Sequence, residues 1–558
     1  MSPELVLPDQ FSHLKDVEVT VIEDPPTAEE IETVLKTFKN NKSAGTDKLK
    51  TEGLKYNSSK ELINALLMLF TMIWSYVSVP VFWLHATITC LHKKGPFNIA
   101  KNYRGLSIGA NMSRILAKVI LKRLKEAYEK NISDAQFGFR RNRSTTDAIF
   151  VLKSVIDKYN GTLIAVYIDL TAAYDHIPRN FMFKVLELRT GASHLIAILF
   201  KMYQGTTASI LGMKEKFEVL VGCRQGGQES PCIFNYYFDY VLKVAANEID
   251  KEFPKGWGIE FEFNIPHSCT NREQRQEGRM NGVELIRWLL YADDLVLFCR
   301  NVVEAEKIIQ ILHNTCSRFG LNISFLKTKT QVFNNEELAN LDSLFTIGEN
   351  VIENVSEFTY LGQTFSNKEQ GCFTDLRISK AIGKFNEMRQ VLTDHKVNMA
   401  TRMKLMDACV RSRLLYGTQA WYINVECAKK LETCWMELLR QMVKGGWRRL
   451  PTLDEAEEME FRLRYTNADI LRITKCIPLR SVIRSQYLKY IGHVCRCSNT
   501  MMTKKMLFAI PKRAYHRDPW INIAKMLNVS SEQAKRSTQL KVGFAALIGR
   551  QFNNATPW

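Results

Sequence analysis

The chain has 558 residues, of which 46% are hydrophobic and 24% are charged. This composition excludes a fibrous or disordered chain, and the length is too great for one compact core, so we expect several domains. The formal net charge of +18 says nothing about the fold, but it favours a polyanionic partner such as nucleic acid.

The 13 cysteines are scattered and form no C-x-x-C pair, so they indicate neither a zinc ribbon nor a thioredoxin-like site. His493, Cys495 and Cys497 are the closest grouping, but their spacing is too tight for the usual zinc knuckle. Free thiols suit a reducing compartment, and the N-terminus has no signal-peptide pattern. We therefore expect an intracellular protein, in the nucleus, the cytoplasm or both, that is not secreted.

The N-terminal part of the chain predicts an arm followed by helices. Residues 1–26 are expected to form an irregular arm, and Thr27 with Glu30 then fits a capping box at the start of a helix. Segment 62–79 is apolar enough to raise the question of a membrane span, but polar residues interrupt it. We expect a buried helix there, then a strand over 86–91, and no stable association with a membrane.

Basic residues recur along the rest of the chain. A helix is expected from about Met112 to Lys130, and its outer face is predicted to be heavily basic through Arg114, Lys118, Lys122, Arg123 and Lys125. The polar residues 254–282 are expected to form an inserted loop or hairpin. After about residue 370 the pattern becomes mostly helical, with lysine and arginine between the apolar residues.

Acidic residues stand at the ends of two predicted strands. A strand over 163–168 stops at Asp169, and residues 289–298 are expected to form a hairpin whose turn contains Asp293 and Asp294. Aspartate is common in tight turns, which is the plain structural alternative. Three carboxylates at adjoining strand ends would instead make an oxygen-only site suited to Mg²⁺, and two such ions about 3.5–4 Å apart can promote phosphoryl transfer.

Three ordered motifs carry a resemblance to a known family. Residues 291–294 (YADD) resemble the Y-x-D-D motif of reverse transcriptases, and residues 169–175 (DLTAAYD) resemble their first palm motif, D-x-x-x-A-[FY]-D. Between them, residues 224–235 (RQGGQESPCIFN) are similar to R-Q-G-x-x-x-S-P-x-x-F-N. A Y-x-D-D alone is a weak signal, whereas three motifs in the family's order are specific.

The resemblance extends over about residues 27–530 and is to non-LTR (LINE-type) retrotransposon polymerases, without their endonuclease. Its further segments are 40–47 (NNKSAGTD), 102–107 (NYRGLS), 136–146 (QFGFRRNRSTT), 320–323, 327–329, 360–362, 415–417 with Trp421, and 490–493 with Arg496. It implies an α+β right-hand polymerase. The implied parts are an N-terminal arm 1–26, fingers 27–160, a palm 161–370 with an antiparallel sheet and the insertion 254–282, a helical thumb 371–460, and a C-terminal basic helical region 461–558.

The resemblance also implies roles for individual residues. Asp169, Asp293, Asp294 and the backbone carbonyl of Leu170 would hold two Mg²⁺ ions, or Mn²⁺, and Lys327 would protonate the departing pyrophosphate. The nucleotide would be bound by Lys93, Lys94 and Arg104 at the triphosphate, Tyr174 under the sugar, and Gln225 and Gly226 on the template side. Nucleic acid would contact Lys42, Arg140, Arg143 and Tyr291.

The implied activity is RNA-directed DNA synthesis, in which dNTPs are added to a DNA primer on an RNA template. Tyr174 argues against RNA synthesis, because its ring would exclude a 2′-hydroxyl. Glu229 departs from the family pattern as an extra acid near the nucleotide, which leaves the catalytic rate open. The other alternative is a catalytically inactive or co-opted nucleic-acid-binding relic of such a polymerase. The sequence does not identify protein partners.

Overall fold

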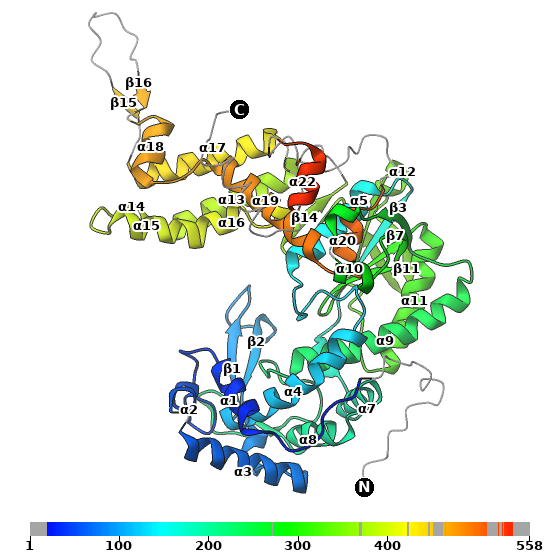
Figure 1. The fold of residues 1–558 in the computed structure, drawn as a ribbon. Helices are drawn as coiled ribbons and strands as arrows, with labels where there is room; N and C mark the ends of the chain where they lie inside the picture. Colours follow the sequence, from blue (N-terminus) through cyan, green and yellow to red (C-terminus); the bar gives the residue numbers. More distant parts are fainter. Residues whose placement is uncertain are drawn as a thin grey trace, which may run out of the picture.

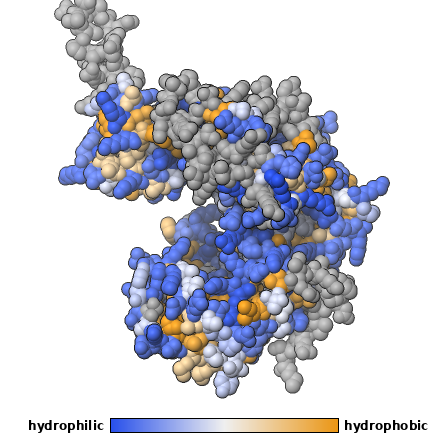
Figure 2. All heavy atoms as spheres, in the orientation of Figure 1, coloured by the Kyte–Doolittle hydropathy of each residue, from blue (hydrophilic) through white to orange (hydrophobic). Residues whose placement is uncertain are grey.

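The computed structural model describes residues 19–57, 59–270, 272–367, 371–420, 423, 425–444, 447–449, 461–463, 465–510, 523, 527 and 529–538. The chain forms two lobes joined along one side (Figure 1). The space-filling view shows a deep cleft between them, and its walls are mostly hydrophilic (Figure 2). Helices and strands are both abundant, as expected for an α+β protein.

A six-stranded sheet forms the core of the predicted palm, with the strand order β11-β12-β10-β3-β9-β8. Its strands are β3 Leu163–Ile168, β8 Trp288–Tyr291, β9 Asp294–Cys299, β10 Lys329–Phe333, β11 Ser343–Ile347 and β12 Asn350–Asn354. Every pair is antiparallel except β10 with β12, which is parallel. The central strand β3 is buried throughout, which explains its continuous apolar sequence.

Helices cover the palm sheet. Helix α11 (Val302–Arg318) packs on β3 and β9 and on α9 (Ser230–Glu252), which in turn packs on α7 (Arg179–Thr190). The other helices in the range predicted as palm or just before it are α5 Thr145–Lys158, α6 Ala173–His176, α8 Ser193–Tyr203 and α12 Glu336–Ala339, of which α8 packs on α7 and α4 in the bottom lobe of Figure 1. The hairpin of β13 Glu357–Tyr360 and β14 Gln363–Ser366 follows the palm sheet.

The lobe drawn at the bottom of Figure 1 holds a four-stranded sheet in the order β2-β1-β4-β5. Its strands are β1 His85–His92, β2 Tyr103–Ile108, β4 Thr207–Ile210 and β5 Phe217–Glu218. Strands β1 and β2 come from the predicted fingers, whereas β4 and β5 come from the range predicted as palm. The finger-like sheet is therefore not contiguous in sequence, and the domain boundaries remain predictions.

The N-terminal helices of this lobe are α1 Ala28–Lys36, α2 Thr51–Tyr56, α3 Lys60–Tyr76 and α4 Asn111–Asn131. Three of them follow the sequence expectations, whereas α2 was not predicted. The capping box at Thr27 and Glu30 is confirmed, and the apolar segment forms α3, whose inner face is buried. Among the described residues, no helix combines the length and apolarity needed to span a membrane.

The outer face of α4 is less basic than expected. Of the five cationic side chains predicted for this face, Lys122 and Lys125 are exposed, whereas Arg114, Lys118 and Arg123 are only partly accessible. The Arg123 guanidinium is 7% exposed, pairs with Glu30 at 2.7 Å, and lies over the Trp74 ring. These three side chains fasten α4 to α1 and α3, because a buried cation needs a paired anion.

A second hydrophobic core lies in the predicted thumb. Its helices are α13 Gly371–Glu387, α14 Arg389–Thr393, α15 Met399–Leu405, α16 Ser412–Leu414, α17 Val425–Met442 and α18 Asn467–Thr474, with a π-helical turn at Met406–Arg411. The short strands β15 Trp447–Arg449 and β16 Phe461–Leu463 pair beyond α17. Trp421 and most of the C-terminal region beyond residue 510 lie outside the described residues.

Helix α19 (Leu479–Arg496) links the two cores. Its first turns, at Leu479 and Ile483, pack in the thumb core, and its later turns, from Tyr487 to Cys495, pack in the palm core. In the insertion, β6 Ile259–Asn264 and β7 Asn281–Ile286 form a hairpin, and α10 Arg272–Glu277 lies between its two strands in sequence. This hairpin packs against the segment that follows α19, where it contacts α20 Met502–Leu507 and α22 Ser531–Ser537. This hairpin overlaps the segment 254–282 that was expected to form an inserted loop or hairpin, and its second strand continues to Ile286.

Candidate active site

The acidic turn joins β8 to β9, where Tyr291 pairs with Asp294 across the hairpin. Ala292 adopts a left-handed backbone with φ of 58°. The buried Gln136 side chain holds this residue from both sides, because its Oε1 accepts from the Ala292 N–H at 2.9 Å and its Nε2 donates to the Ala292 carbonyl at 3.2 Å. Gln136 therefore fixes an energetically unfavourable turn conformation.

Gly138 completes the support beneath the turn. A Cβ atom at this position would lie 2.3 Å from the Ala292 nitrogen, so only glycine allows the two backbones to approach so closely. The 136–146 segment was recognised from the sequence only as a family motif. The functional role of Gln136 and Gly138 as the support of the acidic turn was missed, since nothing in their spacing relates them to a turn more than 150 residues away.

Asp169 reaches the same place from the neighbouring strand. Ile168 pairs with Leu295 in the antiparallel β3–β9 ladder, so the next position on each strand brings Asp169 beside Asp294. The Asp169 carbonyl accepts from the Ser324 N–H, and the Thr171 N–H donates to Asn322, both at 2.8 Å. This short ladder does not use the Leu170 carbonyl.

The three carboxylates influence one another electrostatically. Burial and then the charge of Asp169 raise the pKa of Asp293, while Arg104 and Lys327 oppose this rise. Burial, followed by the charges of Asp293 and Asp169, raises the pKa of Asp294 to about 6, although its side chain reaches solvent. Both shifts mean that burial first, and then the neighbouring carboxylates, disfavour the charged forms of these groups.

Lys327 lies at the edge of this acidic cluster. Its Nζ is 2.9 Å from Asp169 Oδ2, and the two side chains are 67% and 38% exposed. An exposed pair of this kind contributes little to stability. The pair is relevant to function because it places the Lys327 ammonium group beside Asp169, which is predicted from the sequence to bind metal.

The donor chemistry suits a hard divalent cation. Within the described part of the chain, no three His, Cys, Asp or Glu side chains are already gathered as a ligand set. The residues at the strand ends are nevertheless carboxylates whose charged forms burial and mutual repulsion disfavour, and carboxylates are ligands that Mg²⁺ prefers and would stabilise in the charged form. Asp169, Asp293 and Asp294 therefore fit such an ion, and the free Leu170 carbonyl could add a fourth oxygen.

Tyr174 lies between the acidic turn and the start of α9. Its ring stacks on Phe234, with centroids 4.3 Å apart and planes 14° from parallel. Burial and then the charge of Asp293 raise the pKa of its hydroxyl, so the group stays protonated beside the carboxylate. The ring is partly exposed and is held in place by this stacking, as the predicted exclusion of a 2′-hydroxyl requires.

Gln225 and Gly226 form the tip of a tight turn that lies against β2. The Gln225 amide donates to both Asp175 carboxylate oxygens at 2.8 and 2.9 Å, and its carbonyl accepts from the Ser107 N–H at 2.7 Å. Gly226 has φ of +100°, and a Cβ there would lie 2.6 Å from the Leu106 side chain. The turn is thus fixed between the first palm motif and the fingers sheet.

The predicted triphosphate ligands lie at the far end of the β1–β2 hairpin. Arg104 pairs with Leu91 across the hairpin, is exposed, and is close enough to Asp293 to lower its pKa. Lys93 and Lys94 follow β1 directly and are exposed. The structure therefore brings Arg104 toward the carboxylates and leaves the two lysines in solvent at the hairpin tip.

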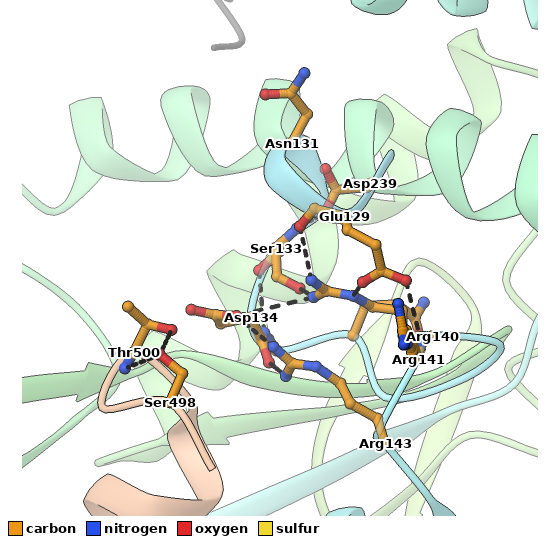
Figure 3. A network of polar contacts seen from close by, with 12 residues as sticks. Glu129, Asn131, Ser133, Asp134, Arg140, Arg141, Arg143, Asp239, Ser498 and Thr500 are labelled. Atoms are coloured by element: carbon orange, nitrogen blue, oxygen red, sulfur yellow. Dashed lines mark hydrogen bonds and ion pairs between the residues drawn. The ribbon is translucent and has the colours of Figure 1, made fainter. Parts of the chain in front are cut away.

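Two residues predicted to contact nucleic acid are instead held in a network of polar contacts within the protein (Figure 3). Arg140 pairs with Glu129 at 3.3 Å, and its side chain is 4% exposed. Arg143 donates to the Asp134 carbonyl at 2.6 Å and pairs with its carboxylate, with a side chain that is 5% exposed. Both guanidinium groups fasten the loop after α4, and we do not propose them as contacts to nucleic acid.

The other two residues of that set are accessible. Lys42 is exposed in the loop between α1 and α2. Tyr291 is half-buried at the acidic turn, where burial and the nearby Tyr416 raise the pKa of its hydroxyl. Glu229, suspected as an extra acid beside the nucleotide, is instead buried, and its carboxylate accepts from the Tyr203 hydroxyl at 2.9 Å.

This arrangement of strands and carboxylates agrees with the comparison to known families. The reverse transcriptase (RNA-dependent DNA polymerase) model matches residues 91–365, which include Asp169, Asp293 and Asp294. Residues 91–365 belong to the reverse transcriptase family. The matched domain runs from the end of β1 to β14, so the expected right-hand polymerase fold is confirmed.

Several relatives of this reverse transcriptase domain come from mobile elements. A transposon-derived protein of Caenorhabditis elegans is 27% identical over 233 residues, which is 41% of this chain and 78% of that protein. The retrovirus-related Pol polyprotein of the type-1 retrotransposable element R2 of Popillia japonica is 24% identical over 259 residues, 45% of this chain and 32% of that protein. The group II intron-encoded protein LtrA of Lactococcus lactis is 24% identical over 195 residues, 34% of this chain and 31% of that protein.

These relatives bear out the resemblance to non-LTR retrotransposon polymerases. The chain spans most of the C. elegans protein but only about a third of the R2 polyprotein and of LtrA. What those longer proteins do as a whole therefore does not transfer to this chain.

Proposed function

We propose that this chain is an RNA-directed DNA polymerase of a LINE-type retroelement, which extends a primer 3′-hydroxyl with dNTPs by two-metal phosphoryl transfer. The observation that carries this proposal is the meeting of Asp169 with the Asp293–Asp294 turn on adjacent strands of a reverse transcriptase domain. RNA template and DNA primer would occupy the hydrophilic cleft between the lobes (Figure 2).

The geometry supports a defined division of labour. Two Mg²⁺ or Mn²⁺ ions held by the three aspartates and the Leu170 carbonyl would activate the attacking hydroxyl and neutralise the departing pyrophosphate. Arg104 would bind the triphosphate beside Asp293, with Lys93 and Lys94 nearer the hairpin tip. Lys327 has an ammonium group at the edge of the carboxylates, from which it would donate a proton to pyrophosphate.

The direct test is primer extension on poly(rA)/oligo(dT) with dTTP and Mg²⁺. The proposal requires extension by the folded wild-type chain and its loss when EDTA removes the divalent ions. A folded chain that binds the template and primer but extends nothing would support the alternative of a co-opted nucleic-acid-binding relic. The intact carboxylate set gives no reason to prefer that alternative.

Replacing Tyr174 with alanine is expected to weaken discrimination against ribonucleotides. The ring is fixed on Phe234 beside Asp293, and its removal would open space for a 2′-hydroxyl. We expect the ratio of kcat/KM for dTTP to that for UTP to fall about 10-fold to 100-fold, the range that one added steric contact can supply. The measurement is single-nucleotide incorporation with each substrate.

The matched control for this substitution is Tyr76→Ala. Tyr76 is exposed at the end of α3, so its loss removes a tyrosine without touching the site. An unchanged dTTP/UTP ratio in Tyr174→Ala, with extension retained, would assign the ring to core packing instead.

A further inference from the structure

Glu229 is an acid buried directly beneath the turn that carries Gln225 and Gly226. It precedes α9, and its side chain points inward rather than capping the helix. A Cβ atom on Gly227 would lie 2.7 Å from Glu229 Oε1, so the carboxylate fills the space under this turn. The Glu229 side chain therefore lies directly against the backbone at Gly227.

The Tyr203 hydroxyl holds the Glu229 carboxylate in this place. Its oxygen is 2.9 Å from Glu229 Oε1 and 3.3 Å from Ser230 Oγ. Ser230 Oγ in turn donates to the Arg224 carbonyl at 2.6 Å, and the Gly227 N–H donates to the same carbonyl at 2.9 Å. The chain of contacts from Tyr203 thus ends on the backbone of the Arg224–Gly227 turn.

The Tyr203 ring is itself fixed in position. It is fully buried in α8, and the guanidinium groups of Arg224 and Arg179 lie 5.0 and 5.2 Å from its centroid. Arg179 also donates to the Tyr203 carbonyl at 2.6 Å. Burial raises the pKa of the Tyr203 hydroxyl, so it remains a donor to Glu229. A buried carboxylate oxygen held by such a donor has little freedom to move, because the Tyr203 hydroxyl and Glu229 Oε1 are each other's partners.

We propose that Glu229, held by the Tyr203 hydroxyl, is a positioning residue that sets the Arg224–Gly227 turn against the incoming nucleotide. This inference rests on the proposed polymerase function. The departure at Glu229 from the family pattern then has a structural counterpart, because glycine at 227 leaves the room that the Glu229 carboxylate occupies. Because the pair acts on the turn and not on the carboxylates at the acidic hairpin, its loss should weaken nucleotide binding more than catalysis.

The experiment compares steady-state primer extension by wild type, Glu229→Leu, Glu229→Gln, Tyr203→Phe and the double variant Glu229→Leu/Tyr203→Phe. We expect KM for dTTP to rise about tenfold in Glu229→Leu and Tyr203→Phe, with kcat within about twofold of wild type. Glu229→Gln keeps an oxygen that accepts from Tyr203 and should stay within about twofold of wild type in both constants. The double variant should be no worse than either single variant, because both remove one interaction.

Tyr203→Phe keeps the measurement decisive if Glu229→Leu does not fold. Phenylalanine retains the ring that Arg224 and Arg179 contact and removes only the hydroxyl, and thermal melting verifies that the variant is folded. An unchanged KM in a folded Tyr203→Phe, or a loss confined to kcat, would overturn the inference while wild-type extension upholds the polymerase function. Absence of extension by the wild type would defeat both.

Discussion

Replacing Asp293 and Asp294 together with asparagine is expected to lower primer extension by about 1,000-fold or more, equivalent to about 4 kcal/mol of transition-state stabilisation. Asparagine keeps the shape of each side chain but removes the negative charge that would hold the divalent ions. The measurement is the rate of dTTP addition to oligo(dT) on poly(rA) under single-turnover conditions, with template binding measured in parallel.

The loss of activity should not come from unfolding. Burial and mutual repulsion raise the pKa of both carboxyl groups, so their charged forms destabilise the folded chain at neutral pH. The neutral asparagines remove that repulsion, and the melting temperature in EDTA is expected to stay the same or rise. Asp342→Asn, at an exposed position on the palm, is the control for loss of a carboxylate away from the site and should retain full activity. Substantial extension by the folded double variant would refute the assignment of the metal site.

Replacing Arg189 with methionine is expected to destabilise the chain by about 3 kcal/mol, because it leaves a buried carboxylate without its main partner. Arg189 on α7 and Asp239 on α9 form an ion pair of 2.9 Å, and their side chains are 1% and 2% exposed. The same guanidinium donates to the carbonyls of Tyr236 at 2.9 Å and of Asn131 at 2.7 Å. It therefore joins the ends of α4 and α7 to α9, the helix that begins just after the Arg224–Gly227 turn.

The effect is measured as the fall in melting temperature and in the urea midpoint. Lys184→Met in the same helix removes a cation from an exposed pair with Glu187 at 3.0 Å, and it should cost less than about 0.5 kcal/mol. Lys243, 3.5 Å from Asp239, can compensate part of the lost charge, which keeps the expected effect at the lower end of the range for buried pairs. Equal melting temperatures for Arg189→Met and Lys184→Met would show that the buried pair is dispensable.

Several features of this protein were determined by the sequence because they depend on neighbouring residues. The apolar run 163–168, the hairpin around residues 293–294 and the capping box at Thr27 were all predicted where the structure places them. Such elements follow local periodicity and turn chemistry. The ordered motifs likewise indicated the polymerase fold and the family, because their residue types and spacing are specific in combination.

Only the tertiary structure decided which charged residues are free to act. Arg140 and Arg143 read as surface cations in the sequence, yet each is paired inside the protein, and Arg123 on the predicted basic face is buried against Glu30. Burial of a cation depends on an anion supplied by a distant segment or an adjoining turn, and periodicity carries no information about that pairing.

The same reason explains why the supports of the site were missed. Gln136 fixes the acidic turn from more than 150 residues away, and Tyr203 fixes Glu229 from a different helix. The sequence determined which residues carry the chemistry, since the carboxylates must stand at strand ends in a particular order. The tertiary structure decided what holds them, because a hydrogen bond across the fold depends on distances in space and not on spacing along the chain.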